Sequence, residues 1–152
     1  ERLKQACRWE LELIAGEQEK AAAPESDIRL VIFVVATRYY SLIGDFVRDV
    51  VRRRIAEGLP TIDSSMFRAY TAELQNSHSE LQEISESTER KLTQVAIRML
   101  REAGITAGRR EPYQLIRPRL SADIRDTYCA EGSGEDLARL LWSEKEIGEC
   151  SM

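Results

Sequence analysis

The side chains that could support acid–base or metal chemistry are few and poorly spaced for it. The single histidine, His78, stands in a polar stretch with no cysteine or second histidine at a metal-ligand spacing, which favours an exposed loop residue. Glutamates at 80, 83, 86 and 89 could form an acid–base pair or a hard-metal site on one helical face, but a solvated helix start is the favoured interpretation. The nucleotide-binding and nucleophile motifs GxGxxG, GxxxxGK[ST] and GxSxG do not occur. The sequence therefore predicts no catalytic residue, no metal and no cofactor, and hence a protein that is not an enzyme.

The three cysteines, Cys7, Cys129 and Cys150, are odd in number and irregularly spaced, which fits neither a disulfide framework nor a metal knuckle. Cys7 and Cys129 lie within helical patterns, so we expect them to pack as small apolar residues in a protein of the reducing cytoplasm. The most apolar run, residues 30–36, is much shorter than the roughly 18 to 20 residues that span a bilayer. No membrane association is expected.

Charge is distributed unevenly along a chain whose formal net charge is -4. Between Arg90 and Arg119 eight cations face two anions, which gives +6. Between Glu131 and Met152 six acidic residues face two basic ones, which gives -4. This asymmetry predicts one basic face on an acidic body.

Helical periodicity defines the elements that must position these charges. It predicts helices over residues 2–15, 28–43, 41–57, 61–75, 85–103, 121–129 and 133–142, with the β-branched run at 28–40 read as buried helix rather than strand. Thr61 to Asp63 is expected to cap the fourth of these, and the triplet Arg52–Arg54 to be a solvated helix end. The apolar stripes predict these core residues: Phe46, Val50, Leu92, Val95, Met99 and Leu100.

Helical periodicity is interrupted after Gly104, where residues 105–116 predict a small β-hairpin. The fold class is therefore mainly α, a compact helical domain including a helix-turn-helix with a hairpin wing. We divide it into a helical part at 1–60, a winged-helix-like unit at 61–120, and C-terminal helices at 121–152 that pack on the same core. Because the chain lacks an initiator methionine, we expect the N-terminal part to be truncated.

The winged-helix-like unit places cations where DNA would be contacted. In such units the second helix enters the major groove and the wing touches the backbone. The residues suited to phosphates and base edges are Arg90, Lys91, Gln94, Arg98 and Arg101 on the helix, with Arg109 and Arg110 at the hairpin tip. Two alternatives remain: helix-turn-helix units also serve as protein-interaction modules, and these arginines could simply solvate a surface or pair with the acidic tail.

Two stretches resemble a known family. Residues 81–105, LQEISESTERKL continuing to IRMLREAGI, resemble the LSEST-RKL…LREAGL signature of the BrxA family, and RYYSLIGDFV at 38–47 is similar to its RSYPLLREFV stretch. The resemblance covers roughly residues 28–120. It implies a non-enzymatic, cytoplasmic, double-stranded-DNA-binding component of bacterial BREX phage defence, with a NusB-like helical fold and other BREX proteins as partners. The competing hypothesis is an adaptor that assembles the defence complex through its acidic ends without contacting DNA.

Overall fold

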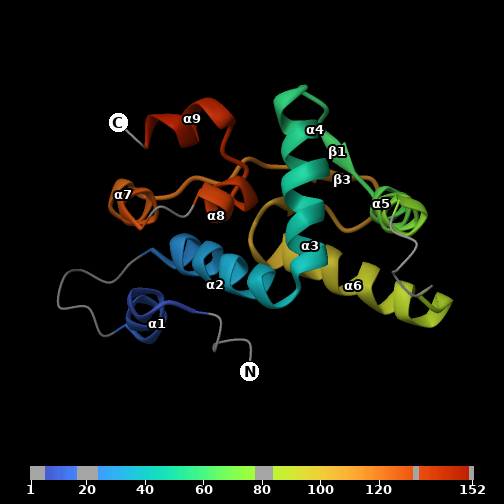
Figure 1. Ribbon diagram of the computed structural model, residues 1–152, viewed down its shortest axis with the longest axis horizontal. Coiled ribbons are helices and arrows are strands. Elements are labelled where there is room, and N and C mark those ends of the chain that lie inside the picture. Colours follow the sequence, from blue (N-terminus) through green and yellow to red (C-terminus); the bar gives the residue numbers. More distant parts are fainter. Residues whose placement is uncertain (1–5, 17–23, 78–83, 132–133, 151–152) are drawn as a thin grey trace.

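A long helix and the helical rod that follows it after a sharp bend organise the fold. The computed structural model describes residues 6–16, 24–77, 84–131 and 134–150. Helix α2 (Glu25–Tyr39) is followed, after a bend of 114° at Tyr40, by one continuous helical rod formed by α3 (Ser41–Phe46), a π-helical turn (Val47–Val51) and α4 (Arg52–Ala56). In Figure 1 this rod stands across α2 and α6 (Glu86–Glu102). The β-branched run is therefore helical, as expected, and mostly buried, although Ile32 and Tyr39 are exposed.

A small antiparallel sheet joins the rod to α6. Its strands are β1 (Thr61–Ile62), β2 (Thr106–Ala107) and β3 (Tyr113–Leu115), in the order β1-β3-β2. Thr106 pairs with Leu115 in the hairpin, and Ile62 pairs with Tyr113 on the other side. The hairpin and the mainly helical class are confirmed. The expected cap at 61–63 is only partly correct, because the first two of its residues form β1.

Helix caps explain where the middle helices begin. Asp63 accepts a hydrogen bond from the backbone N–H of Ser65 (2.9 Å) at the start of α5 (Ser64–Ser77). Ser85 accepts one from the N–H of Thr88 at the start of α6, as the sequence predicted. Helix α5 ends at Ser77, two residues beyond the predicted end at 75, and residues 78–83 lie outside the described residues.

Both ends of the chain form short helices. They are α1 (Arg8–Ala15), α7 (Ala122–Ala130), α8 (Gly134–Arg139) and α9 (Glu144–Glu149). Helices α1 and α8 contact α2, and α7 and α9 pack against α8. The helix predicted at 133–142 exists but is shorter than expected: α8 ends at Arg139, and Leu141 has a left-handed backbone with φ 70°. Ser143 and Glu146 then form a reciprocal capping box that starts α9, which the sequence analysis missed.

One hydrophobic core receives residues from most of these helices. Its fully buried members include Val34, Phe46, Phe67, Leu100 and Tyr128. Of the six predicted core residues, Phe46, Met99 and Leu100 are buried, whereas Val50, Leu92 and Val95 are only partly buried and pack against the core from its edge. These three lie at the margins of their helical stripes, where a side chain covers the core and still reaches solvent.

Two expectations about cysteine are corrected. Cys129 and Cys150 form a disulfide, with their Cα atoms 5.1 Å apart, and so link α7 to the residue after α9. Cys7 is exposed and has a free thiol, because it precedes α1 as its cap instead of packing inside the helix.

Gly44 of α3 lies against the side chain of Arg139 in α8. A Cβ atom placed on it would lie 2.7 Å from Nε of Arg139 and 3.1 Å from Cβ of Thr37. Arg139 is itself buried and forms ion pairs with Glu135 (3.1 Å) and Asp45 (3.6 Å). Only glycine lets the buried guanidinium lie against the helix backbone at this point.

Candidate nucleic-acid interface

One arc of α6 carries most of the candidate residues. Its apolar side, including Ala96, Met99 and Leu100, faces the core. The opposite side is exposed and carries Arg90, Lys91, Gln94, Arg98 and Arg101. The structure therefore brings these five predicted residues together on one surface.

The hairpin tip presents the other two candidates. Arg109 and Arg110 follow Gly108, whose φ of 111° suits a residue without a Cβ, and both arginines are exposed. The hairpin is linked to α6 by Arg101, whose guanidinium carbon lies 5.3 Å from the ring centroid of Tyr113 in β3. Arg101 thus has a structural contact that the sequence did not reveal.

Most of these cations have no acidic partner within the described part of the chain. Arg90 comes no closer than 3.9 Å to Glu86, both being exposed, and no other ion pair involves the seven candidates there. Exposed pairs at such separations contribute little. The positive charge of α6 and the hairpin tip is thus available for an external anion.

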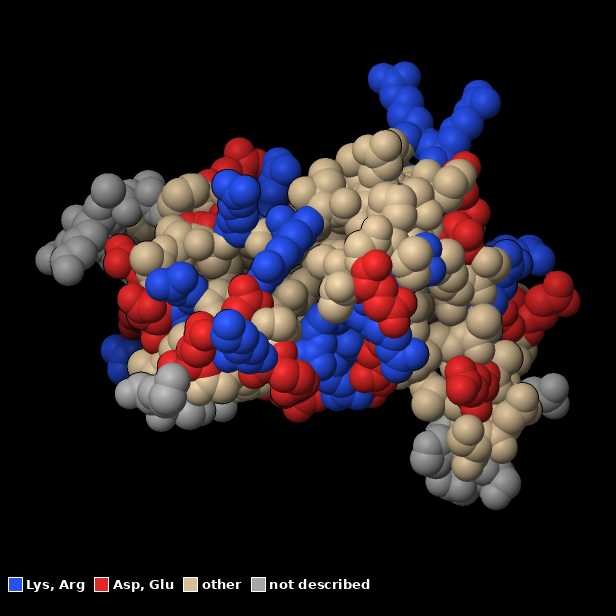
Figure 2. Space-filling model, turned by 90° about the horizontal axis from the view of Figure 1, so that it is seen from above, with Lys and Arg blue, Asp and Glu red and all other residues tan. Residues whose placement is uncertain are grey.

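The acidic C-terminal segment pairs with other cations. Asp136 binds Arg38 (2.8 Å), Glu135 binds Arg48 (3.2 Å), and Glu144 binds Arg52 (2.8 Å). Glu146 pairs with Arg117, the one member of the basic stretch that forms an ion pair with the described part of the tail. On the face seen in Figure 2, basic and acidic side chains alternate over the body, and two basic side chains project clear of the rest.

The arginine triplet Arg52–Arg54, which begins α4 near the end of the helical rod, is not simply a solvated helix end. Arg52 donates to the carbonyl of Trp142 (3.0 Å), and Arg54 donates to the carbonyl of Thr61 (2.6 Å). Arg53, between them, is exposed. Two of the three therefore hold neighbouring segments in place.

A buried polar cluster, which the sequence analysis missed, ties α1, α2, α7 and α8 together. Arg38 donates to both carboxylate oxygens of the fully buried Glu10 (2.5 and 3.1 Å), and Tyr128 donates to Glu10 as well (2.9 Å). Burial, together with the negative charge of Glu10 and the hydrogen bond to it, raises the pKa of Tyr128. The groups of this cluster satisfy one another's hydrogen bonds, so we assign it to stability.

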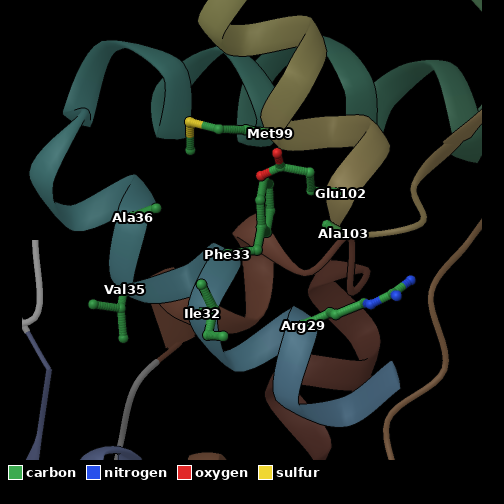
Figure 3. A pocket seen from close by; sticks show the side chains of 8 residues that line it. All are labelled: Arg29, Ile32, Phe33, Val35, Ala36, Met99, Glu102 and Ala103. Atoms are coloured by element: carbon green, nitrogen blue, oxygen red, sulfur yellow. The ribbon is translucent and has the colours of Figure 1, made fainter. Parts of the chain in front are cut away.

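Two hollows adjoin α6 on different sides. An apolar one of about 400 Å³ lies between α2 and the last turn of α6. In Figure 3 the Phe33 ring points toward Glu102, with Met99 and Ala103 on either side, and the Arg29 head group extends away. A polar one of about 480 Å³ is lined by Ser64 and Arg68 of α5, Gln94 of α6 and Glu111 of the hairpin tip, among others. The polar hollow lies beside the cationic arc.

Sites for chemistry are not evident in the described part of the chain. No group of three or more His, Cys, Asp or Glu residues there could hold a metal ion. His78 and the glutamates at 80 and 83 lie outside the described residues. Among the described helices no single one is long and apolar enough to cross a membrane, although α2 and the bent rod Ser41–Ala56 pass that criterion as a pair.

The Arg117–Glu146 pair predicts a pH effect on stability. The guanidinium of Arg117 lowers the pKa of Glu146 from 4.5 to about 2. Because the folded protein holds this proton less tightly than the unfolded chain, the contribution is complete above pH 4.5 and is lost as the pH falls toward 2. Since the side chain of Arg117 is 50% exposed and that of Glu146 is 35% exposed, solvent screens the pair and we expect a contribution of less than about 1 kcal/mol.

Urea unfolding of the wild type and Glu146→Gln checks this effect. The stability difference between them should be largest near neutral pH and should shrink between pH 4.5 and 2. Glu149→Gln, a change at an exposed glutamate of the same helix, serves as the control and should show a much smaller pH-dependent difference. A constant difference for Glu146→Gln across this range would contradict the prediction.

Together the fold and this surface define a mainly helical protein with a small antiparallel sheet and an exposed cationic helix. The family model of BrxA matches residues 1–131, so the chain belongs to the BrxA family, a component of BREX phage-defence systems. A solved structure, the crystal structure of an uncharacterized protein from Magnetospirillum magneticum, is 19% identical with a TM-score of 0.76, and the match covers 91% of this chain and 70% of that one. This likeness supports the fold. No curated protein matches the chain.

Proposed function

We propose that this chain is a non-enzymatic, cytoplasmic component of a BREX system that binds double-stranded DNA through a winged-helix unit and acts with other BREX proteins. The observation that carries the proposal is the arc of exposed cations on α6, continued by Arg109 and Arg110 at the hairpin tip. The relation to NusB implied by the family stays a prediction.

The order of elements supports the winged-helix assignment. A helix ending in α4 is followed by β1, α5, α6, β2 and β3, and β3 lies between the other two strands. We assign α5 and α6 as the helix-turn-helix pair and the β2–β3 hairpin as the wing. In this assignment α6 is the recognition helix, and its exposed arc faces the groove.

The chemistry of the arc fits duplex DNA. Arginine and lysine contact phosphates and guanine, and a glutamine amide can bond to adenine in the major groove. Gln94 lies among the cations of the arc, whereas Arg109 and Arg110 at the tip are suited to the backbone. The overall charge of -4 does not oppose this, because the described acidic tail residues that form ion pairs do so with cations outside the candidate set.

A retardation assay on random-sequence duplex at two or more salt concentrations tests the proposal. Wild-type affinity should fall steeply with salt. Arg109→Ala combined with Arg110→Ala should weaken binding to all sequences about equally and lower the slope of log K against log salt by roughly one to two.

The matched control is Arg8→Ala combined with Lys145→Ala, which removes the same charge from exposed positions on α1 and α9. This control should bind much more like the wild type. Unchanged binding by the arginine variant would remove the tip from the DNA site.

The alternative is an adaptor that holds other defence proteins and does not contact DNA. The exposed acids Glu131 and Glu149 near the C-terminus favour it, since they add negative charge beyond the ion-paired set. If the wild type showed no salt-sensitive DNA binding, the adaptor would become the preferred function.

A further inference from the structure

The wing is attached to α5 by a single acidic side chain. Glu111, directly after Arg109 and Arg110, accepts a hydrogen bond from the backbone N–H of Ser64 (2.9 Å) and another from the Ser64 hydroxyl. Ser64 is the first residue of α5, where backbone N–H groups lack partners within the helix. Glu111 therefore caps α5 from a position 47 residues away in the sequence.

The attachment links three parts of the proposed DNA surface. Glu111 and Ser64 line the polar hollow of about 480 Å³ together with Gln94 and Arg90 of α6. On the other side of the hairpin, Arg101 of α6 lies over Tyr113 of β3. The wing is thus held at two points, by α5 through Glu111 and by α6 through Tyr113.

We infer that Glu111 is a positioning residue for DNA binding, which fixes the wing tip so that Arg109 and Arg110 are held in place relative to α6. This inference rests on the proposed function. A carboxylate beside two phosphate-binding arginines should by charge alone weaken DNA binding. The attachment made by Glu111 favours binding through preorganisation, because a fixed wing tip does not have to be ordered when DNA binds.

The charge of Glu111 lowers DNA affinity and its attachment of the wing raises it, so substitution shows which effect is larger. Glu111→Ala removes a negative charge and the attachment; we expect affinity to fall by about three- to tenfold because ordering the tip then opposes binding. The matched control is Glu102→Ala, which removes an exposed carboxylate from the last turn of α6 with no ion pair in the described chain. It should bind DNA as tightly as the wild type or more tightly.

Ser64 provides a test at constant charge. Ser64→Thr keeps the hydroxyl donor and should preserve affinity, whereas Ser64→Ala loses one of the two hydrogen bonds and should weaken binding in the direction of Glu111→Ala. If both Ser64 variants behaved as the wild type, the hydroxyl bond would have no part in positioning the wing.

A double-mutant cycle distinguishes positioning from general loss of stability. In the wild-type background, Arg109→Ala with Arg110→Ala should cost roughly tenfold or more at about 0.1 M salt. In the Glu111→Ala background the same two substitutions should lower DNA affinity much less, because arginines that are not held in position contribute little to binding. A purely structural role for Glu111 would leave the two effects additive.

Hydrogen exchange on the free protein tests the attachment without DNA. The Ser64 amide and the amides of residues 107–111 should exchange faster in Glu111→Ala than in the wild type. In Glu102→Ala their exchange rates should be unchanged. If exchange responds but the wild type does not bind DNA, the proposed function fails, and the role of Glu111 in DNA binding with it. If the wild type binds DNA while Glu111→Ala binds as tightly or more tightly, or the cycle is additive, the proposed function stands and this inference is overturned.

Discussion

Arg38→Ala should lower the free energy of unfolding by about 3–5 kcal/mol. The guanidinium faces Glu10, whose side chain is 0% exposed, and Asp136, whose side chain is 13% exposed. Removing it leaves two carboxylates without their main positive partner in a site that water barely reaches. The loss should appear as a lower midpoint in urea with little change in the slope of the transition.

The control is Arg8→Ala, which removes an arginine side chain from an exposed position. Arg8 pairs with Glu12 at 3.0 Å, but its side chain is 93% exposed. We expect a change within about 0.5 kcal/mol. A loss below about 1 kcal/mol for Arg38→Ala would show that the cluster is more hydrated than its burial indicates.

The second large effect concerns DNA. Replacing Arg90, Lys91 and Arg98 together by glutamine should lower duplex affinity by roughly 10² to 10³ at about 0.1 M salt and reduce the salt slope by about three. All three are exposed on α6, and glutamine is a good helix former, so the fold should be retained. Circular dichroism and thermal unfolding of the variant would verify this directly.

A charge-matched triple at Arg8, Arg125 and Lys145 controls for the change in net charge, since these residues are exposed on other helices. Gln94→Ala provides a further comparison, because it carries no charge and should leave the slope unaltered while changing sequence preference. Equal losses for the two charge triples would mean that net charge, and not the α6 surface, governs binding.

The sequence predicted elements whose signal is local and strong. Helix α6 has a wide apolar stripe and a clear serine cap, so its start, its end and its exposed arc could all be inferred. The β2–β3 hairpin was visible as a break in periodicity. By contrast, β1 has only two residues, too few to show alternation, and its pairing with β3 is a long-range contact that propensity does not contain.

Buried charge was the harder feature to predict. Glu10 in a helix reads as a solvated position, and its burial depends on Arg38 and Tyr128, which come from distant parts of the chain. The end of α8 was missed for a related reason, because a leucine with positive φ at 141 gives no sign in the sequence. The role of Glu111 likewise depends on the approach of the hairpin to α5.

The packing of α8 into the core shows that the folded unit extends beyond the residues that match the family. The family match ends at residue 131, yet Leu137, Leu140 and Leu141 complete the core, and Asp136 completes the partners of Arg38. A fragment that ends at residue 131 would leave an apolar face of the core exposed to solvent. It would also leave Arg38 with Glu10 but without Asp136. We expect such a fragment to aggregate, so expression boundaries for this chain should follow the core and not the family signature.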